Sequence, residues 1–147
     1  MERKFMEEAL KEAKKAYEKL EIPVGAVIVQ NGKIIARAHN LKETKQTALA
    51  HAEILAIQKA NKKLKNWRLL DCEMYVTLEP CEMCMGAITS SRIKKLFIGT
   101  TDPKKQEKID TQKNYERYGI EIEVGILQEE SEYILKEFFR TLRKNGG

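Results

Sequence analysis

The sequence has little of what marks fibrous, secreted or membrane proteins. It contains only 8 Gly and 3 Pro among 147 residues, which excludes a collagen-like or linker-dominated chain. Its three cysteines are too few and wrongly spaced for a secreted disulfide scaffold. Its best apolar run, residues 24–29, is far too short to cross a membrane. We therefore expect a soluble, cytoplasmic protein without a membrane partner.

The composition is sufficient for one folded domain. Hydrophobic residues at 42% and charged residues at 33% exclude a disordered chain. We find no repeat, linker or low-complexity segment, so we predict a single domain over residues 1–147. The net charge of 27 − 22 = +5 favours an anionic partner such as nucleic acid, although a solvated lysine surface gives the same balance.

Periodic apolar patterns predict helices that alternate with strands. Two short apolar runs, 24–30 and 33–38, flank Asn31-Gly32, a dipeptide typical of tight hairpin turns. The other expected elements are helices at 3–20, 49–63, 80–90, 104–118 and 129–143, a loop at 40–46, and strands at 73–78, 94–99 and 120–126. This order predicts an α/β fold with a mostly parallel sheet, helices on both faces and the antiparallel hairpin at one edge.

One group of residues has the chemistry of a catalytic metal site. His51 and Glu53 open one expected helix, and Pro80, Cys81 and Cys84 open the next. An imidazole and two thiolates suit Zn²⁺, and three protein ligands leave a fourth position for water, whose pKa zinc lowers to about 7. Glu53 is placed to move the proton of this water as general acid and base. The H-x-E and P-C-x-x-C pair is a described signature of zinc-dependent nucleobase deaminases.

A closed structural zinc site is the alternative to a catalytic one. Either Cys72 or His39 would complete four ligands, and the metal would then support the fold alone. Cys72 precedes a strand whose far end carries the site, which places it about 20 Å away, so we expect a small buried residue. His39 is more typical of a hydrogen-bonded structural residue. We therefore favour the open site.

Three of the aromatic residues also have expected roles. Trp67 falls in an expected loop, and we predict that its burial anchors the loop. Phe138 and Phe139 are adjacent in the last expected helix. One of them should pack in the core, which leaves at most one to stack on a base.

Several further segments occur in a fixed order along the chain. The most specific is VTLEPCEMC at 76–84, and the others are PVGAV at 23–27, AHN at 38–40, AHAE at 50–53, WRL at 67–69, SRI at 91–93 and FFR at 138–140. In these segments the sequence resembles the bacterial tRNA-specific adenosine deaminases of the cytidine deaminase superfamily. The resemblance implies a three-layer α/β/α sandwich, whose five-stranded mixed sheet has an antiparallel N-terminal hairpin and parallel remaining strands. It also implies one Zn²⁺ per chain and a homodimer.

The same resemblance implies roles for individual residues. His51, Cys81 and Cys84 would hold the zinc, and Glu53 would move protons. The residues that would meet the substrate are Val24, Asn40, the backbone at Ala52, Asp102 and Lys104. The implied reaction is hydrolysis of adenosine to inosine at the wobble position of the tRNA anticodon loop.

The chain departs from that family pattern after Lys104. The segment at 105–118 is charged and is shorter than the corresponding segment of the family, and it lacks the family's glycine-rich turn. A deaminase of a free purine or pyrimidine base, such as guanine or cytosine, or of a nucleoside, is therefore the alternative function. A non-catalytic, zinc-stabilised RNA-binding module is a third hypothesis, which Glu53 and the open fourth position disfavour. For an RNA substrate, basic residues including Arg140 and Arg143 would form a phosphate-binding rim.

Overall fold

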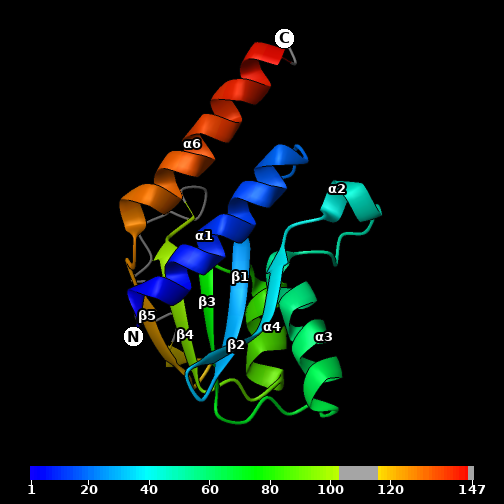
Figure 1. The fold of residues 1–147 in the computed structure, drawn as a ribbon, viewed down its shortest axis with the longest axis vertical. Helices are drawn as coiled ribbons and strands as arrows, with labels where there is room; N and C mark the ends of the chain where they lie inside the picture. The colour runs from blue at the N-terminus through cyan, green and yellow to red at the C-terminus, as the bar shows by residue number, and fades with distance from the viewer. Residues whose placement is uncertain (103–115, 146–147) are drawn as a thin grey trace.

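The computed structural model describes residues 1–102 and 116–145. The helices and strands labelled in Figure 1 are, in chain order, α1 (Arg3–Glu18), β1 (Gly25–Gln30), β2 (Lys33–His39), α2 (Lys42–Lys45), α3 (Ala52–Leu64), β3 (Cys72–Leu78), α4 (Glu82–Ser90), β4 (Lys95–Thr100), β5 (Glu121–Val124) and α6 (Gln128–Asn145). Most of them begin and end close to the predicted positions. The helix expected at 104–118 falls largely outside the described residues.

The sheet has five strands in the order β2-β1-β3-β4-β5. Strand β1 pairs antiparallel with both β2 and β3, whereas β3, β4 and β5 run parallel to one another. The predicted mixed sheet, with its hairpin at one edge, is therefore confirmed. Asn31 and Gly32 both have positive φ, +51° and +75°, as the tight turn between β1 and β2 requires.

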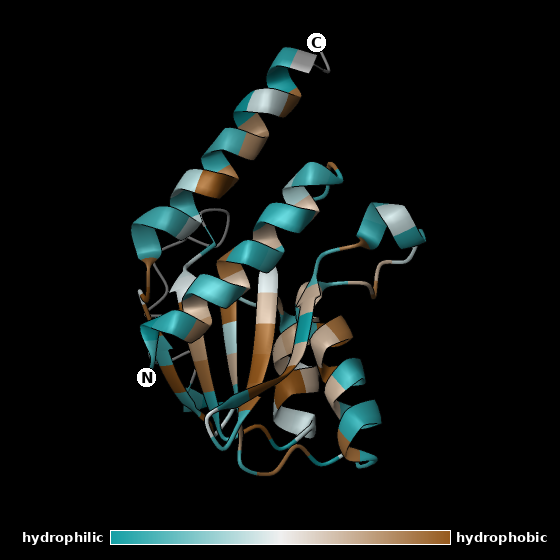
Figure 2. Ribbon diagram, in the orientation of Figure 1, coloured by the Kyte–Doolittle hydropathy of each residue, from teal (hydrophilic) through white to brown (hydrophobic). Residues whose placement is uncertain are grey.

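Helices cover both faces of this sheet, which confirms the three-layer sandwich. Helices α1 and α6 lie on one face, and α3 and α4 lie on the other (Figure 1). Ala26 and Ile28 of β1 pack in the core beneath α3 and α4, whereas Val27 and Val29 pack in the core beneath α1. Burial on both faces explains why β1 is almost continuously apolar. Figure 2 shows the same pattern, with apolar strands and a hydrophilic outer surface on α1.

No helix in the described part of the chain is long and apolar enough to span a bilayer.

Three local predictions are wrong. Pro80 precedes α4 instead of opening it, because Cys81 stays extended and takes the N-cap position. The expected loop at 40–46 contains the short helix α2. Trp67 is 53% exposed, because the side-chain amide of Asn61, which donates to the carbonyls of residues 66 and 67, holds its loop. The guanidinium group of Arg68 lies over the Trp67 ring, 4.4 Å from its centroid.

Helix α1 packs so closely on β1 that Gly25 has no room for a side chain. A Cβ atom there would overlap the carbonyl oxygen of Ala9 and lie 2.5 Å from the backbone nitrogen of Ala13. Because both obstacles are backbone atoms, Gly25→Ala is expected to lower the free energy of unfolding by about 3 kcal/mol or more. Urea denaturation measures this change.

Gly86 is the matched control for this substitution. It lies in α4, it is exposed, and a Cβ atom there would meet nothing within 4 Å. Gly86→Ala should therefore raise stability by about 0.5–1 kcal/mol through helix propensity. Equal urea midpoints for the two variants would refute the close contact between α1 and β1.

Candidate functional site

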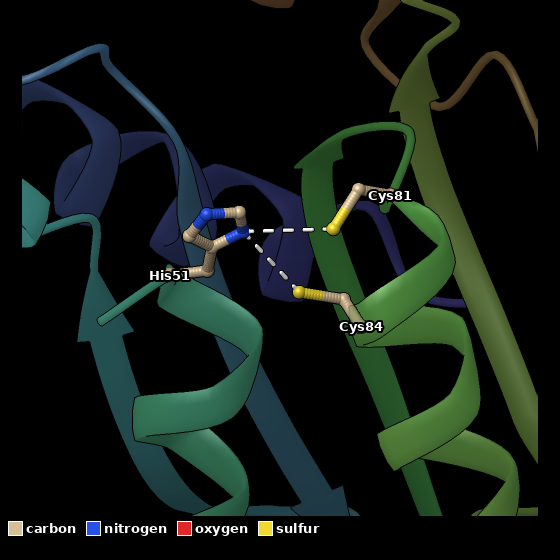
Figure 3. Close-up of side chains that lie close together, drawn as sticks. All are labelled: His51, Cys81 and Cys84. Carbon is tan, nitrogen blue, oxygen red and sulfur yellow. Dashed lines mark hydrogen bonds between the residues drawn. The ribbon is translucent and has the colours of Figure 1, made fainter. Parts of the chain in front are cut away.

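Two helix starts lie side by side at one end of the sheet. Helix α3 begins directly after His51, and α4 begins directly after Cys81. Both preceding residues have extended backbones, with φ and ψ of −74° and 152° at His51 and −73° and 174° at Cys81. Neither side chain caps its own helix. The imidazole and the thiol therefore point into the space between the helices (Figure 3).

His51, Cys81 and Cys84 converge in that space. The Nδ1 atom of His51 lies 3.7 Å from Sγ of Cys81 and 3.5 Å from Sγ of Cys84 (Figure 3). The three ligand atoms lie within 4.8 Å of one another. Tetrahedral Zn²⁺ with bonds of about 2.0–2.3 Å would separate such atoms by about 3.6 Å. The three side chains therefore fit a zinc ion.

The electrostatics of the group also suit a bound cation. Burial, and then the nearby Glu53 carboxylate and Cys81, raise the pKa of the Cys84 thiol. A divalent cation would offset these effects and favour the thiolate. Burial and the positive charge of Lys42 lower the pKa of His51, which keeps the imidazole neutral, the form that binds metals.

The structure separates Cys72 and His39 from this group. Among the described residues, the cluster that could hold a metal contains His51, Cys81 and Cys84 only. Cys72 is buried, and burial followed by Asp71 raises the pKa of its thiol to about 11. His39 Nδ1 instead lies 2.9 Å from a Glu12 carboxylate oxygen. The closed four-ligand alternative therefore has no support in this part of the chain.

A cavity of about 190 Å³ opens beside the three side chains. It is smaller than the roughly 300–1,000 Å³ of pockets for drug-sized ligands, so it suits a small flat group. Most residues expected at the site line it together: Val24, Asn40, His51, Ala52, Glu53, Cys81 and Asp102. Glu53 is 4% exposed. Lys104 lies outside the described residues.

The sequence analysis missed four residues that line the same cavity. They are Ile22, Lys42, Leu78 and Glu79. Glu79 positions Asp102, because its carboxylate accepts a hydrogen bond of 3.0 Å from the backbone N–H of Asp102. The sequence feature that could have identified Glu79 is its place directly before Pro80 in the VTLEPCEMC segment. No sequence feature identifies Lys42, because it follows Asn40 in a stretch that the sequence predicts as loop.

Asn40 is fixed by its neighbours. Its side-chain nitrogen donates to the carbonyl of Ile22 at 3.2 Å, and its side-chain oxygen accepts the backbone N–H of Lys42 at 3.1 Å. An amide side chain has two N–H donors and two acceptor lone pairs, so each end retains one further position. The two bonds therefore hold the Asn40 side chain, with its remaining donor and acceptor positions, in a fixed orientation at the cavity wall.

A second, larger hollow of about 650 Å³ adjoins the first and shares Ile22, Leu78 and Asp102 with it. Helix α6 supplies Lys136, Phe139 and Arg143 to its wall. Phe138 is buried and Phe139 is 37% exposed, so one of the two phenylalanines packs in the core, as predicted. Arg140 does not line this hollow, and its guanidinium pairs with Glu137 at 2.7 Å.

An α/β/α sandwich with a His/Cys/Cys group at two helix starts, and a glutamate beside it, defines the class of the zinc-dependent deaminases. The family model described as MafB19-like deaminase matches residues 1–143. The chain is 52% identical, over 144 residues, to a tRNA-specific adenosine deaminase of Bacillus subtilis (strain 168), with 95% of this chain and 89% of that protein covered. The chain therefore belongs to this deaminase family, in its tRNA-specific adenosine deaminase branch.

Solved structures agree with the fold and with the deaminase family. A structure from a study of A-to-I editing by tRNA:A34 deaminases superposes with a TM-score of 0.83 at 38% identity, covering 91% of this chain and 100% of that one. A guanine deaminase from Bacillus subtilis superposes with a TM-score of 0.68 at 36% identity, covering 79% of this chain and 75% of that one. The predicted fold class and family are confirmed.

Proposed function

We propose that this protein hydrolyses adenosine to inosine at the wobble position of the tRNA anticodon, and that it does so in the cytoplasm. The observation that carries the proposal is one cavity lined by His51, Glu53, Cys81 and Asp102, with Cys84 beside them. Similarity to tRNA-specific adenosine deaminases and to a tRNA:A34 deaminase supports the choice of substrate.

His51, Cys81 and Cys84 would hold one Zn²⁺ per chain, which when bound would lower the pKa of water enough to supply a nucleophile near neutral pH. Glu53 accepts the proton of the attacking water on its carboxylate. It delivers this proton to N1 of the purine, and it then moves the second proton, from the hydroxyl group formed on C6, to the leaving amino nitrogen. The water oxygen replaces the amino group at C6, so adenosine and water give inosine and ammonia.

The other cavity residues hold the base and exclude bulk water. Val24 packs on the flat base, while the remaining amide capacity of Asn40 and the backbone at Ala52 hydrogen-bond to the purine. Asp102, whose backbone Glu79 fixes, meets the sugar and backbone of the nucleotide. Lys104 is also proposed to contact the sugar and backbone of the nucleotide. A base must leave its stack to enter so small a cavity, which suits an anticodon loop.

The adjoining hollow on α6 suits the rest of the anticodon loop. Lys136 and Arg143 offer positive charge for phosphates, and the exposed Phe139 offers a ring for a second base. We also propose a homodimer, for which Met83, 37% exposed on α4 beside the site, is a candidate contact residue.

Salt dependence distinguishes tRNA from a free base as substrate. A ligand that places several phosphates on the protein should bind with a log–log salt slope of about −0.7 per contact on single strands, whereas a free base should show almost none. Arg143→Ala should flatten the slope for an anticodon stem-loop by about 0.7. Fluorescence anisotropy at several salt concentrations measures it.

Lys63→Ala is the matched control, because Lys63 is exposed in the last turn of α3, about 15 Å along the helix from Glu53. Parallel incubation with total tRNA, nucleosides and free bases then completes the test. Ammonia from free guanine, without inosine in tRNA, would establish the alternative that the similarity to a guanine deaminase favours. Binding of RNA without any turnover would establish the non-catalytic module.

A further inference from the structure

Glu21 is a buried carboxylate outside the proposed chemistry. It lies between the end of α1 and Ile22, and it is 1% exposed. The chain turns sharply at Leu20, which has φ of +60°, and the Glu21 backbone N–H then donates to the carbonyl of Ala16. This turn directs Glu21 into the protein. A buried carboxylate is costly unless hydrogen bonds satisfy it, so its partners are informative.

The hydrogen-bond partners of Glu21 belong to helix α2. Its two carboxylate oxygens accept the N–H groups of Glu43 at 3.0 Å and Thr44 at 2.6 Å. Burial opposes ionisation, but hydrogen bonds from Thr44 and Glu43 outweigh it and lower the pKa of Glu21. The carboxylate is therefore ionised at neutral pH, and it forms charge-assisted hydrogen bonds to a helix N-terminus.

Helix α2 depends on these bonds. It has four residues, far fewer than an isolated helix needs in water, and its N-cap residue Leu41 makes no side-chain cap. The N–H of Lys42 bonds to the Asn40 side chain, and the N–H of Lys45 bonds to the carbonyl of Leu41. Glu21 thus supplies both of the remaining partners that the first turn requires.

The same bonds connect two segments that line the cavity. Ile22, next to Glu21, belongs to one segment, and Lys42, next to Glu43, belongs to the other. Asn40 joins the two segments a second time through its bonds to Ile22 and Lys42. A shift of α2 would therefore move Asn40 and Lys42 relative to Ile22.

We propose that Glu21 is a positioning residue, which caps α2 from a distance and thereby holds Asn40 and Lys42 in the geometry that binds the base. This inference rests on the proposed function of the cavity. Glu21 itself touches neither the substrate nor the metal-binding group. Its effect should therefore be on substrate binding, with metal binding and proton transfer left intact.

Glu21→Gln tests the proposal, because Gln keeps the size but presents an N–H₂ group to one of the two backbone amides. We expect KM for an anticodon stem-loop to rise by about tenfold or more, with kcat within about threefold of the parent and an unchanged zinc content. Amide hydrogen exchange at Glu43 and Thr44 should accelerate, whereas exchange in α3 should not. Glu21→Asp, which keeps the charge, should have a smaller effect on both readouts.

Glu12→Gln is the matched control, because Glu12 is a similarly buried carboxylate whose hydrogen bonds go to Lys15 and His39 instead of α2. It should leave KM and the exchange at Glu43 and Thr44 near the parent values. A rise in KM of equal size in both variants, or unchanged exchange at Glu43 and Thr44 in Glu21→Gln, would overturn the proposal. If the parent chain forms no inosine, the proposed function fails, and the exchange measurement still decides the role of Glu21.

Discussion

Glu53→Gln is expected to lower kcat by about 10²- to 10⁴-fold while zinc stays bound and the fold stays intact. Gln has the size of Glu, but it cannot accept the proton of water and return it to the base. The position makes this effect direct, because Glu53 is buried in the first turn of α3 and lines the cavity together with His51. Steady-state kinetics and elemental analysis of the purified variant measure the two quantities.

Glu82→Gln provides the control for this substitution. Like Glu53, Glu82 lies in the first turn of its helix, where it directly follows Cys81, but its side chain is 84% exposed. This variant should keep kcat within about twofold of the parent, because the charge of an exposed carboxylate contributes little to the folded protein. Loss of zinc from Glu53→Gln, or turnover within about tenfold of the parent, would contradict the assigned role.

The residues of the candidate site were predictable because their spacing is local. His51 and Glu53 lie two positions apart, and Cys81 and Cys84 lie three apart. Each pair belongs to one helix start, so the chemistry of each half can be recognised without knowing the fold. The strand and helix alternation then predicts that the two halves meet, and the distances from His51 to both thiols agree with that prediction.

Helix α2 and the place of Lys42 were missed because they depend on a contact between distant segments. Helix α2 is capped by Glu21, 22 residues earlier in the chain, so no local pattern predicts it. Lys42 reaches the cavity only because α2 forms. Local propensity predicts a loop in this stretch, and tertiary contacts of this kind override that propensity.

Cys84→Ala is expected to abolish metal binding and to lower the melting temperature by about 10 °C or more. Cys84 is fully buried, and its removal would leave two ligands where the folded protein presents three. Metal binding stabilises the folded state, because the ligands are brought together only by folding. The parent should therefore lose a similar amount of stability in the presence of a strong chelator, and the variant should not respond to it.

Cys72→Ala distinguishes loss of the metal from loss of a buried sulfur atom. Cys72 is as buried as Cys84, but it starts β3 and lies outside the three-residue cluster. Its replacement should cost only the small penalty of a lost core contact, with one zinc per chain retained and the chelator response unchanged. Thermal unfolding with and without chelator, combined with zinc analysis, compares the three proteins. Stoichiometric zinc in Cys84→Ala, or its loss from Cys72→Ala, would show that the metal lies elsewhere, because removal of a ligand sulfur releases the metal and removal of a packed sulfur does not.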